Sequence, residues 1–392
     1  MIKFSGLLVA SLSLLACTTA PENGSNNPPS QAEAAVDQAA AVDSVPNTEP
    51  VTPVPELDTK KPYLTFAAVG DMMLGTDYPE NHLPDDDGIG FLQHVTPILV
   101  SADLSFGNLE GVLVNGGEPA KKCRNANACY LFRAPTRYAQ LLADAGFDAL
   151  SLANNHARDF GEDGRSATML ALESVGIVHS GRAGDFAILE TAGLTVSFVA
   201  FAVTRNSNLL HDYALAADIV TAQAALYDLV VVSFHGGAEG RNTTRIPFAE
   251  EEYFGEPRGD VARFARSMVD SGADFVFGHG PHVVRGMERY KDRLIAYSLG
   301  NFATYYGISV EGVKGIAPIL IVVVDQQGRF IEGRLHSTIQ IRPDGPSVDP
   351  DQQALTLMRD LSRRDFPDSG LQFHEDGRIS RVTRPALPTG AR

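Results

Sequence analysis

The sequence predicts an α/β fold built on a largely parallel sheet. Five short runs rich in Val, Phe, Leu and Ala each lead into Gly or Asn and a side chain that can bind metal, and helix-like segments lie between them. Short apolar runs that stop at turn residues are typical of buried strands. Strands that alternate with helices of this length favour βαβ units. With 392 residues, 44% of them hydrophobic, the chain is long enough to form one large domain.

The predicted elements follow in order along the chain. The strands that precede the candidate ligands are 63–69, 104–106, 147–153, 228–234 and 275–277. The helices are 91–99, 135–145, 163–175, 219–226 and 260–269. The C-terminal part has a different pattern, with strands at 316–324 and 330–341 and a helix at 352–361. We expect these last strands to form a second sheet packed on the first, and residues from 376 onward to be weakly ordered.

Polar side chains follow the five predicted strands. Because loops at the carboxyl ends of parallel strands lie along one edge of a sheet, we expect these side chains to meet in one cleft. Carboxylates, imidazoles and an amide oxygen can hold a divalent ion that activates water or polarises a phosphoryl oxygen. Six such ligands suit two ions better than one. The candidates are Asp71, Glu110, Asn155, His235, His279 and His282.

Each candidate taken alone also has a purely structural explanation. Asp71 would serve as a turn former, Glu110 as a solvated charge, and Asn155 or His235 as a cap or a satisfied side chain at a strand end. The last two histidines flank Gly280-Pro281, where the proline restricts the loop. The position of all six side chains at predicted strand ends favours the metal site.

The N-terminus has the pattern of an export signal. Lys3 precedes an apolar run at 4–16 that is too short to span a bilayer comfortably. The run ends in Leu14-Leu15-Ala16-Cys17, which resembles a bacterial lipobox, although an ordinary signal peptide with a chance cysteine is the alternative. Acyl chains on Cys17 would give stable membrane anchoring. We therefore expect a signal peptide at 1–16 and a lipid-anchored protein of the cell envelope, and in a Gram-negative cell Thr18 favours the outer membrane.

Residues 17–61 are predicted to be a disordered tether. The segment is rich in Pro, Ala, Asn, Ser and Thr and contains no aromatic residue, so it cannot bury enough surface to fold. It holds seven acidic residues, and Lys60 and Lys61 are its only basic residues, so it supplies part of the formal net charge of −16. The acidity of the chain argues against a nucleic-acid partner held by phosphate contacts.

Two further cysteines, Cys123 and Cys129, lie in a short loop. A structural disulfide is the interpretation that suits an oxidising compartment. A zinc pair would need two more ligands nearby, and none is obvious.

Several motifs of the chain resemble the CapA-type capsule proteins. The similarity covers roughly residues 62–305 and extends to about 345. The motifs are Val69-Gly70-Asp71-Met72-Met73-Leu74, Gly107-Asn108-Leu109-Glu110, Leu152-Ala153-Asn154-Asn155-His156-Ala157-Arg158-Asp159-Phe160-Gly161, Gly278-His279-Gly280-Pro281-His282-Val283 and Tyr297-Ser298-Leu299-Gly300-Asn301-Phe302. The resemblance implies a calcineurin-like metallophosphoesterase fold, an α/β sandwich of two mixed sheets flanked by helices. That domain would span 62–345, followed by a C-terminal helix and a weakly ordered end at 346–392.

The resemblance also implies roles for the motif residues at two divalent metal ions, Mn, Fe or Zn. Asp71 and His282 would hold the first ion, and Glu110 would bridge the two. The ligands of the second ion would be Asn155, His235 and His279.

Two further residues would assist the chemistry. His156 would act beside the metals as a general acid or as a donor to the leaving oxygen. Asp159 would orient its imidazole, because a carboxylate commonly fixes the tautomer of a histidine.

Three positions depart from the family pattern. Met73 stands where the superfamily has a histidine, and a thioether is a poor ligand for a hard ion. The string from His235 to Glu239 lacks the usual tryptophan, and Gly280 replaces a histidine that is frequent in relatives. We therefore expect a weak, exchangeable or partly occupied first metal site, with Glu239 available as an extra ligand or a substrate contact.

Three arginines near the motifs are candidate contacts for a phosphate or carboxylate, because a guanidinium suits a pair of oxygens. They are Arg158, Arg133 and Arg285. The alternative for each is a surface ion pair, and Arg158 is retained as a candidate substrate contact.

Three functions remain open from the sequence. The first is a phosphoesterase-like hydrolase involved by resemblance in poly-γ-glutamate or capsule synthesis and export, with His156 assisting departure of the leaving group. The second is a metal-dependent amide hydrolase that acts on polyglutamate. The third is a non-catalytic surface protein that binds an anionic polymer. The expected partners are such a polymer or phosphoester, the membrane through the lipid anchor, and membrane proteins of capsule synthesis or export.

Overall fold

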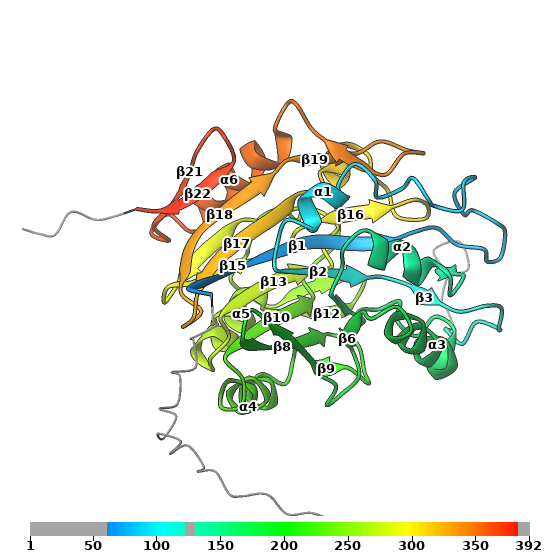
Figure 1. Ribbon diagram of the computed structural model, residues 1–392, viewed down its shortest axis with the longest axis horizontal. Helices are drawn as coiled ribbons and strands as arrows, with labels where there is room; N and C mark the ends of the chain where they lie inside the picture. The colour runs from blue at the N-terminus through cyan, green and yellow to red at the C-terminus, as the bar shows by residue number, and fades with distance from the viewer. Residues whose placement is uncertain (1–60, 122–129, 383–392) are drawn as a thin grey trace, which may run out of the picture. The chain divides into compact units, whose positions relative to one another are not determined.

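Two mixed β-sheets packed face to face form the centre of the protein (Figure 1). The computed structural model describes residues 61–121 and 130–382. The first sheet has nine strands, and the order along it is β21-β22-β18-β17-β1-β2-β5-β6, with β16 beside β1. Its strands are β1 (Tyr63–Met73), β2 (Leu104–Leu109), β5 (Ala149–Ser151), β6 (Val178–Ser180), β16 (Asn301–Thr304), β17 (Ile319–Asp325), β18 (Phe330–His336), β21 (Leu371–Phe373) and β22 (Arg378–Arg381).

The second sheet has seven strands in the order β14-β15-β13-β10-β8-β7, with β9 beside β8. Its strands are β7 (Ala187–Thr191), β8 (Leu194–Ala202), β9 (Asn208–Leu209), β10 (Leu229–His235), β13 (Phe275–His279), β14 (Met287–Tyr290) and β15 (Arg293–Ala296). Three small two-stranded sheets lie outside these layers. They are β3 (Val112–Leu113) with β4 (Arg133–Ala134), β11 (Glu251–Tyr253) with β12 (Glu256–Gly259), and β19 (Thr338–Gln340) with β20 (Pro346–Val348).

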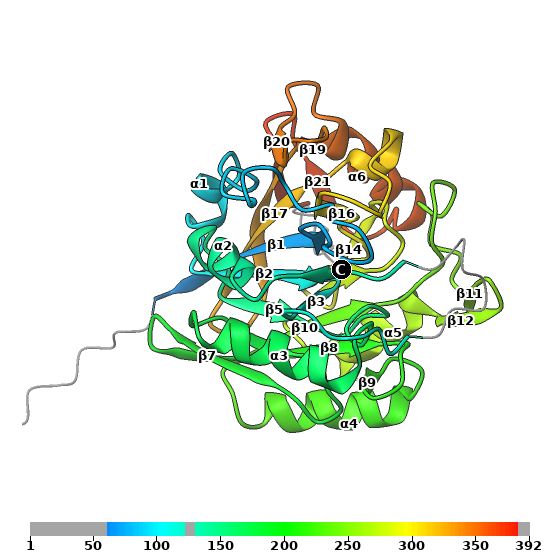
Figure 2. The same cartoon turned by 90° about the vertical axis from the view of Figure 1, so that its right-hand side faces the viewer.

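Helices cover the outer faces of both sheets (Figure 2). Helices α1 (Thr96–Leu99), α2 (Tyr138–Asp144) and α3 (Gly161–Glu173) lie over the first sheet, and α4 (Tyr213–Ala224) and α5 (Val261–Asp270) lie over the second. Helix α6 (Gln353–Asp365) contacts β14 and β18, so it bridges the two sheets. A short 3₁₀ helix, η2, spans Gly312–Gly315. None of the helices in the described part of the chain has the length and apolar character needed to span a bilayer.

The alternation of side chains along each strand explains why the strands read as continuous apolar runs. In β1, Leu64 and Phe66 point into the core between the sheets, whereas Ala67 and Val69 point toward the helices. In β10, Val231 points into the core between the sheets and neighbouring valines face α4 and α5. Because both faces of these strands are buried, apolar residues occupy successive positions.

The five predicted strands that precede the candidate ligands are confirmed, and so is the strand predicted at 316–324. Residues 330–341 were predicted as one strand, but they form two, β18 and β19, which belong to different sheets. The arrangement of the C-terminal strands was predicted wrongly. Strands β17 and β18 do not form a second sheet, because β17 pairs antiparallel with β1 and therefore extends the first sheet. The second sheet is built from the middle of the chain. Residues from 376 were expected to be weakly ordered, but Arg378–Arg381 forms β22, which pairs with β18.

The predicted helix at 91–99 is also wrong in extent, since only Thr96–Leu99 is helical. Pro97 has no amide hydrogen and is tolerated only in the first turn of a helix, so the helix begins next to it. The residues before it form turns instead. The other predicted helices are present with shifted ends. Helix α4 begins at Tyr213, six residues before the predicted start, because the side chain of Asp212 accepts a hydrogen bond from the Leu215 amide at 3.1 Å and caps the first turn.

Candidate metal centre and active site

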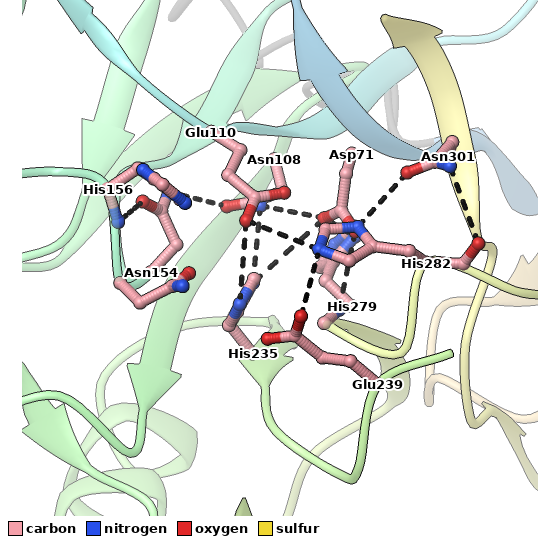
Figure 3. Close-up of polar contacts among 12 residues, drawn as sticks. Asp71, Asn108, Glu110, Asn154, His156, His235, Glu239, His279, His282 and Asn301 are labelled. Carbon is pink, nitrogen blue, oxygen red and sulfur yellow. Dashed lines mark hydrogen bonds and ion pairs between the residues drawn. The ribbon is translucent and has the colours of Figure 1, made fainter. Parts of the chain in front are cut away.

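Strands of both sheets end at one cluster of polar side chains (Figure 3). Asp71 lies near the end of β1, and Glu110 directly follows β2. His235 and His279 are the last residues of the parallel neighbours β10 and β13 and are paired in register. The cleft therefore draws its ligands from two sheets, whereas the sequence predicted the edge of one.

A close backbone contact fixes Asp71. The Asp71 amide donates to the Gly300 carbonyl at 2.8 Å. A Cβ atom on Gly70 would lie 2.0 Å from the same carbonyl oxygen, so only glycine allows this approach. This is the physical reason for the Gly-Asp string at the end of β1.

Acidic and imidazole groups from separate segments meet within a few ångströms. Ligand atoms of Asp71, Glu110 and His282 all lie within 4.8 Å of one another. The Nδ1 atom of His282 is 3.2 Å from Asp71 Oδ2, and its Nε2 atom is 3.7 Å from Glu110 Oε1. His279 Nδ1 lies 3.4 Å from Asp71 Oδ1, and His235 Nε2 lies 3.9 Å from Glu110 Oε1. All five side chains are buried.

Several buried atoms of this cluster make no hydrogen bond. They are both carboxylate oxygens of Glu110, Nε2 of His235, both ring nitrogens of His279 and Oδ1 of Asn155. Buried polar atoms are normally paired, because an unpaired one costs about 1–3 kcal/mol. Oxygen and imidazole nitrogen atoms that converge without hydrogen-bond partners match the ligand preferences of a divalent cation. These residues therefore fit a metal site.

The pKa shifts in the cluster follow from burial and from close opposite charges. Burial raises the pKa of Glu110 to about 8, and the nearby Asp71 carboxylate adds to the increase. Burial opposes the charged form of His282, but Glu110 and Asp71 outweigh it and raise the pKa of His282 to about 10. Burial would also raise the pKa of Asp71, yet His279 and His282 hold it well below its usual range. Burial lowers the pKa of His235.

A second set of contacts orients His282. Its backbone adopts a left-handed conformation with φ of 58°, and its Nδ1 atom lies 3.0 Å from Asn301 Oδ1. The amide nitrogen of Asn301 donates to the carbonyls of Ser309 and Lys314 at 3.2 and 3.0 Å. Asn301 thus holds the His282 imidazole and the loop that follows β16 in one arrangement, in which His282 Nε2 faces Glu110.

His156 lies beside the cluster and is oriented by a carboxylate. Its Nδ1 atom is 2.8 Å from Asp159 Oδ2, which leaves Nε2 free of this contact. The same Asp159 oxygen accepts from the Phe132 amide at 2.9 Å, and Lys121 Nζ lies 3.2 Å from the other oxygen. Burial lowers the pKa of His156, although Asp159 opposes this effect. The Phe132 ring packs on the imidazole with centroids 4.4 Å apart.

Three asparagines hold the site together, and the sequence did not single them out. Asn108 donates to Asp71 Oδ1 at 2.8 Å, and Asn154 donates to Asn108 Oδ1 at 3.1 Å and to the Leu109 carbonyl at 2.9 Å. The third is Asn301. All three lie inside the quoted motifs, so their membership in those strings was the available signal. Asn155, the predicted ligand, instead leaves its side-chain oxygen unpaired.

Glu239 reaches the cluster and is held by a buried arginine. Glu239 Oε2 lies 3.7 Å from His282 Nε2, and Glu239 Oε1 lies 3.1 Å from Arg258 Nη2. Arg258 is fully buried and also donates to the Gly237 carbonyl at 3.0 Å. No motif pointed to Arg258.

Gly280, next to Arg258 in space, has φ of 109°. A Cβ atom on Gly280 would lie 2.9 Å from the Gly236 carbonyl oxygen, so a side chain at this position requires the loop to move.

The three candidate arginines differ in their surroundings. Arg285 is fully buried and makes two hydrogen bonds to Glu251, at 2.8 and 2.7 Å, so its interpretation as a surface ion pair is wrong. Arg158 is exposed and lies 3.4 Å from Glu162. Arg133 packs 5.1 Å from the centre of the Tyr78 ring and donates to Asp77.

Met73 is buried with Phe132 and Ile308, and its sulfur accepts from the Gly75 amide at 3.3 Å. The thioether is thus used in packing. The predicted lipidation residue Cys17 and the predicted disulfide pair Cys123 and Cys129 lie outside the described residues.

The fold and the cluster define a two-sheet α/β protein with a buried carboxylate and imidazole site at converging strand ends. Comparison with known proteins narrows this class. The model of the family "Bacterial capsule synthesis protein PGA_cap" matches residues 65–306. The chain belongs to this family of capsule synthesis proteins.

Two relatives show how far the similarity extends. The chain is 31% identical over 282 residues to the "Capsule biosynthesis protein CapA" of Bacillus anthracis. The aligned region covers 66% of this chain and 63% of that protein. It is 30% identical over 256 residues to the "PGA biosynthesis protein CapA" of Bacillus subtilis strain 168, with coverage of 61% and 63%. The chain therefore spans less than two thirds of the length of these relatives.

Solved structures are more distant. A 5'-nucleotidase precursor from Thermus thermophilus is 14% identical with a TM-score of 0.40, covering 76% of this chain and 59% of that one. The NAD nucleotidase of Haemophilus influenzae is 9% identical with a TM-score of 0.37, covering 76% and 55%. Scores this low do not establish a shared function.

Proposed function

We propose that this member of the capsule synthesis family is a metal-dependent phosphoesterase-like hydrolase. The observation that carries the proposal is the set of buried ligand atoms, from Glu110, His235, His279 and Asn155, that have no hydrogen-bond partner. Asp71, His282 and these four residues would hold divalent ions, Mn, Fe or Zn. Such ions supply an activated water molecule and polarise a phosphoryl oxygen.

The chain's own residues prepare the site for proton transfer. Asp159 engages Nδ1 of His156, so Nε2 is the nitrogen available to exchange a proton with a leaving oxygen. Lys121 compensates the charge of Asp159. The Phe132 ring restricts the imidazole from one side and keeps water from that face. Asn301 and Asn108 fix the orientations of His282 and Asp71 in the same manner.

Metal content and hydrolysis of p-nitrophenyl phosphate by a chain that begins at Lys61 test the proposal. We expect bound divalent metal by elemental analysis and metal-dependent release of nitrophenol. Asp71→Asn should lose both metal and activity. His156→Ala should keep the metal and lose about 100-fold or more in kcat, since general acid–base catalysis contributes about 100- to 10,000-fold.

Two exposed residues provide matched controls. Asp163→Asn and His94→Ala change the same residue types at exposed positions and should retain metal and activity. Absence of bound metal under every loading condition would contradict the proposal. Shortening of poly-γ-glutamate without phosphate ester cleavage would favour the amide hydrolase. Polymer binding that survives His156→Ala, without any hydrolysis, would favour the non-catalytic binder.

We also propose that the protein is lipid-anchored in the cell envelope through Cys17. The support is the sequence pattern of an apolar run that ends in Leu14-Leu15-Ala16-Cys17. Labelling of cells with a fatty-acid analogue should modify the full chain, and Cys17→Ser should remove the label and release the protein from the membrane fraction. Cys123→Ser should keep the label. A label that persists in Cys17→Ser would overturn the anchor. Membrane proteins of capsule synthesis or export are the partners we expect at this location.

A further inference from the structure

An open groove of about 710 Å³ lies beside the metal centre. Its walls include the segments that follow β1 and β16, the two strands that bring Asp71 and Asn301 to the site. Phe132 lines the groove and packs on the His156 ring at 4.4 Å. Ser309 also lines it and receives a hydrogen bond from Asn301. Residues that line the groove therefore contact the metal centre at two places, through His156 and through Asn301.

Aromatic rings form much of the groove surface. The His82 and Tyr306 rings stack in parallel, with centroids 3.8 Å apart and an angle of 9° between their planes. Tyr306 is 41% exposed and Tyr130 is 54% exposed, so both offer ring surface to a ligand. The Tyr78 ring is covered by Arg133, so Tyr130 and Tyr306 are the tyrosines whose rings a ligand can contact. Aromatic side chains contribute a rigid apolar surface with a polar tip.

The charged groups of the groove are mainly acceptors. Glu80 and Glu311 line it and provide carboxylate oxygens. Among the described residues that line the groove, Arg342 is the one with a guanidinium, and it donates from Nη2 to the Ile308 carbonyl and from Nε to the Thr304 carbonyl at 3.4 Å. An ionised carboxylate can only accept hydrogen bonds, so it pairs with hydroxyl groups and repels other anions. The described lining of the groove therefore suits hydroxyl groups better than a polyanionic chain.

We propose that the groove binds a neutral sugar ring, whose hydroxyl groups donate to Glu80 and Glu311 and whose apolar face stacks on Tyr306. This inference rests on the proposed phosphoesterase function, because the sugar would carry the phosphoryl group that the metal centre receives. The substrate class that follows is a sugar phosphate ester.

Binding can be tested without metal and without turnover. Saturation-transfer NMR on the chain from Lys61, in the presence of a chelator, would compare glucose, galactose, N-acetylglucosamine, adenosine, uridine and poly-γ-glutamate. We expect transfer to at least one sugar and a reduction of about fivefold or more in Tyr306→Ala and in Glu311→Gln. Phe254→Ala is the matched control, because Phe254 is 90% exposed and does not line the groove.

Three outcomes of the binding experiment would overturn the proposal. The first is absence of transfer to any sugar. The second is transfer to nucleosides alone with the same dependence on Tyr306. The third is binding of poly-γ-glutamate that Tyr306→Ala abolishes.

Kinetics separate this proposal from the proposed function. The ratio of kcat/KM for a sugar 1-phosphate to that for acetyl phosphate should fall about tenfold in Tyr306→Ala, the range expected for loss of one ring contact. An unchanged ratio would overturn the sugar assignment while hydrolysis itself continues. Failure of both substrates to react, with sugar binding intact, would instead contradict the phosphoesterase function.

Discussion

Asp159 connects three parts of the site through one buried carboxylate. It contacts the imidazole of His156, the amide of Phe132 and the ammonium group of Lys121. The resemblance to the CapA-type proteins implied the first contact. The second and third could not be predicted, because Phe132 and Lys121 lie in a different segment whose path depends on the fold. The same limit applies to Arg258, which belongs to β12 and pairs with Glu239 through the fold of the intervening segment.

Replacement of Asp159 by Asn tests its orienting role. The amide keeps an oxygen for the Phe132 backbone but no longer enforces the same imidazole tautomer, so kcat should fall about 10- to 100-fold. The pH dependence of kcat should change as well, because the charge next to His156 is removed. Metal content should stay as in the unchanged chain. Asp163→Asn, on the exposed side of α3, is the control, and loss of metal in Asp159→Asn would contradict an orienting role.

Elements rather than single residues bring the candidate ligands together. The strands could be predicted because buried strands read as uninterrupted apolar runs, and their ends coincide with the ligands. The division of these strands between two sheets could not be predicted, since local sequence does not specify which strand pairs with which. Strand β1 shows this clearly, because its antiparallel neighbour β17 lies near the end of the chain.

The contact between β1 and the segment that leads into β16 should be sensitive to one added methyl group. Gly70→Ala places a Cβ atom where it meets the Gly300 carbonyl, so the two segments must move apart. We expect a loss of about 1–3 kcal/mol in the free energy of unfolding, as is typical of overpacking. Urea denaturation measures this value. Gly90→Ala is the control, because its nearest neighbours are the ends of flexible side chains, and an equal loss there would refute the explanation.

The connection between α3 and β6 should respond to pH. His179 lies 3.0 Å from Glu173 and 3.6 Å from Asp185. Burial opposes its charged form, but Asp185 and Glu173 outweigh this effect and raise the pKa of His179 above its usual value. A raised pKa in the folded state stabilises the protein below the unfolded pKa, and that stabilisation is lost as the pH rises through the folded pKa.

The comparison of the unchanged chain with His179→Gln measures this contribution. The difference in unfolding free energy should be about 1 kcal/mol or less at about pH 5.5 and should shrink toward about pH 9. His94→Gln should show no such trend, since His94 is exposed. A difference that stays constant with pH would exclude the ion pairs as its cause.

At the scale of the whole molecule, the apolar layer between the sheets holds the candidate metal centre in place. Phe277 of β13 is fully buried there, and its ring centroid lies 6.2 Å from that of Phe106 in the opposite sheet. The amino-acid pattern predicted that these residues are buried. It could not predict that they face each other across two sheets, because that depends on how both sheets twist and pack.

Truncation of this ring should weaken the entire fold. Phe277→Ala leaves a cavity between the sheets and should cost about 3–5 kcal/mol in unfolding free energy. Because His279 follows two residues later on the same strand, metal affinity should fall together with stability. Phe254→Ala, at an exposed position, should change stability by less than about 0.5 kcal/mol. If Phe277→Ala lowered the metal affinity but left the free energy of unfolding unchanged, the apolar layer would not be what links stability to metal binding.

The pairing of β1 with β17 also determines when the protein can fold. Tyr63 is aligned with Asp325, so β1, the first strand of the described residues, waits for a strand near the end of the chain before its hydrogen bonds are complete. Such distant pairings slow folding and leave apolar edges exposed in the meantime. During refolding, pulsed hydrogen exchange should therefore show the amides of β1 and β17 becoming protected together and late. Until then, a nascent chain in which β1 has paired with β2 would still expose the other edge of β1 to wrong contacts.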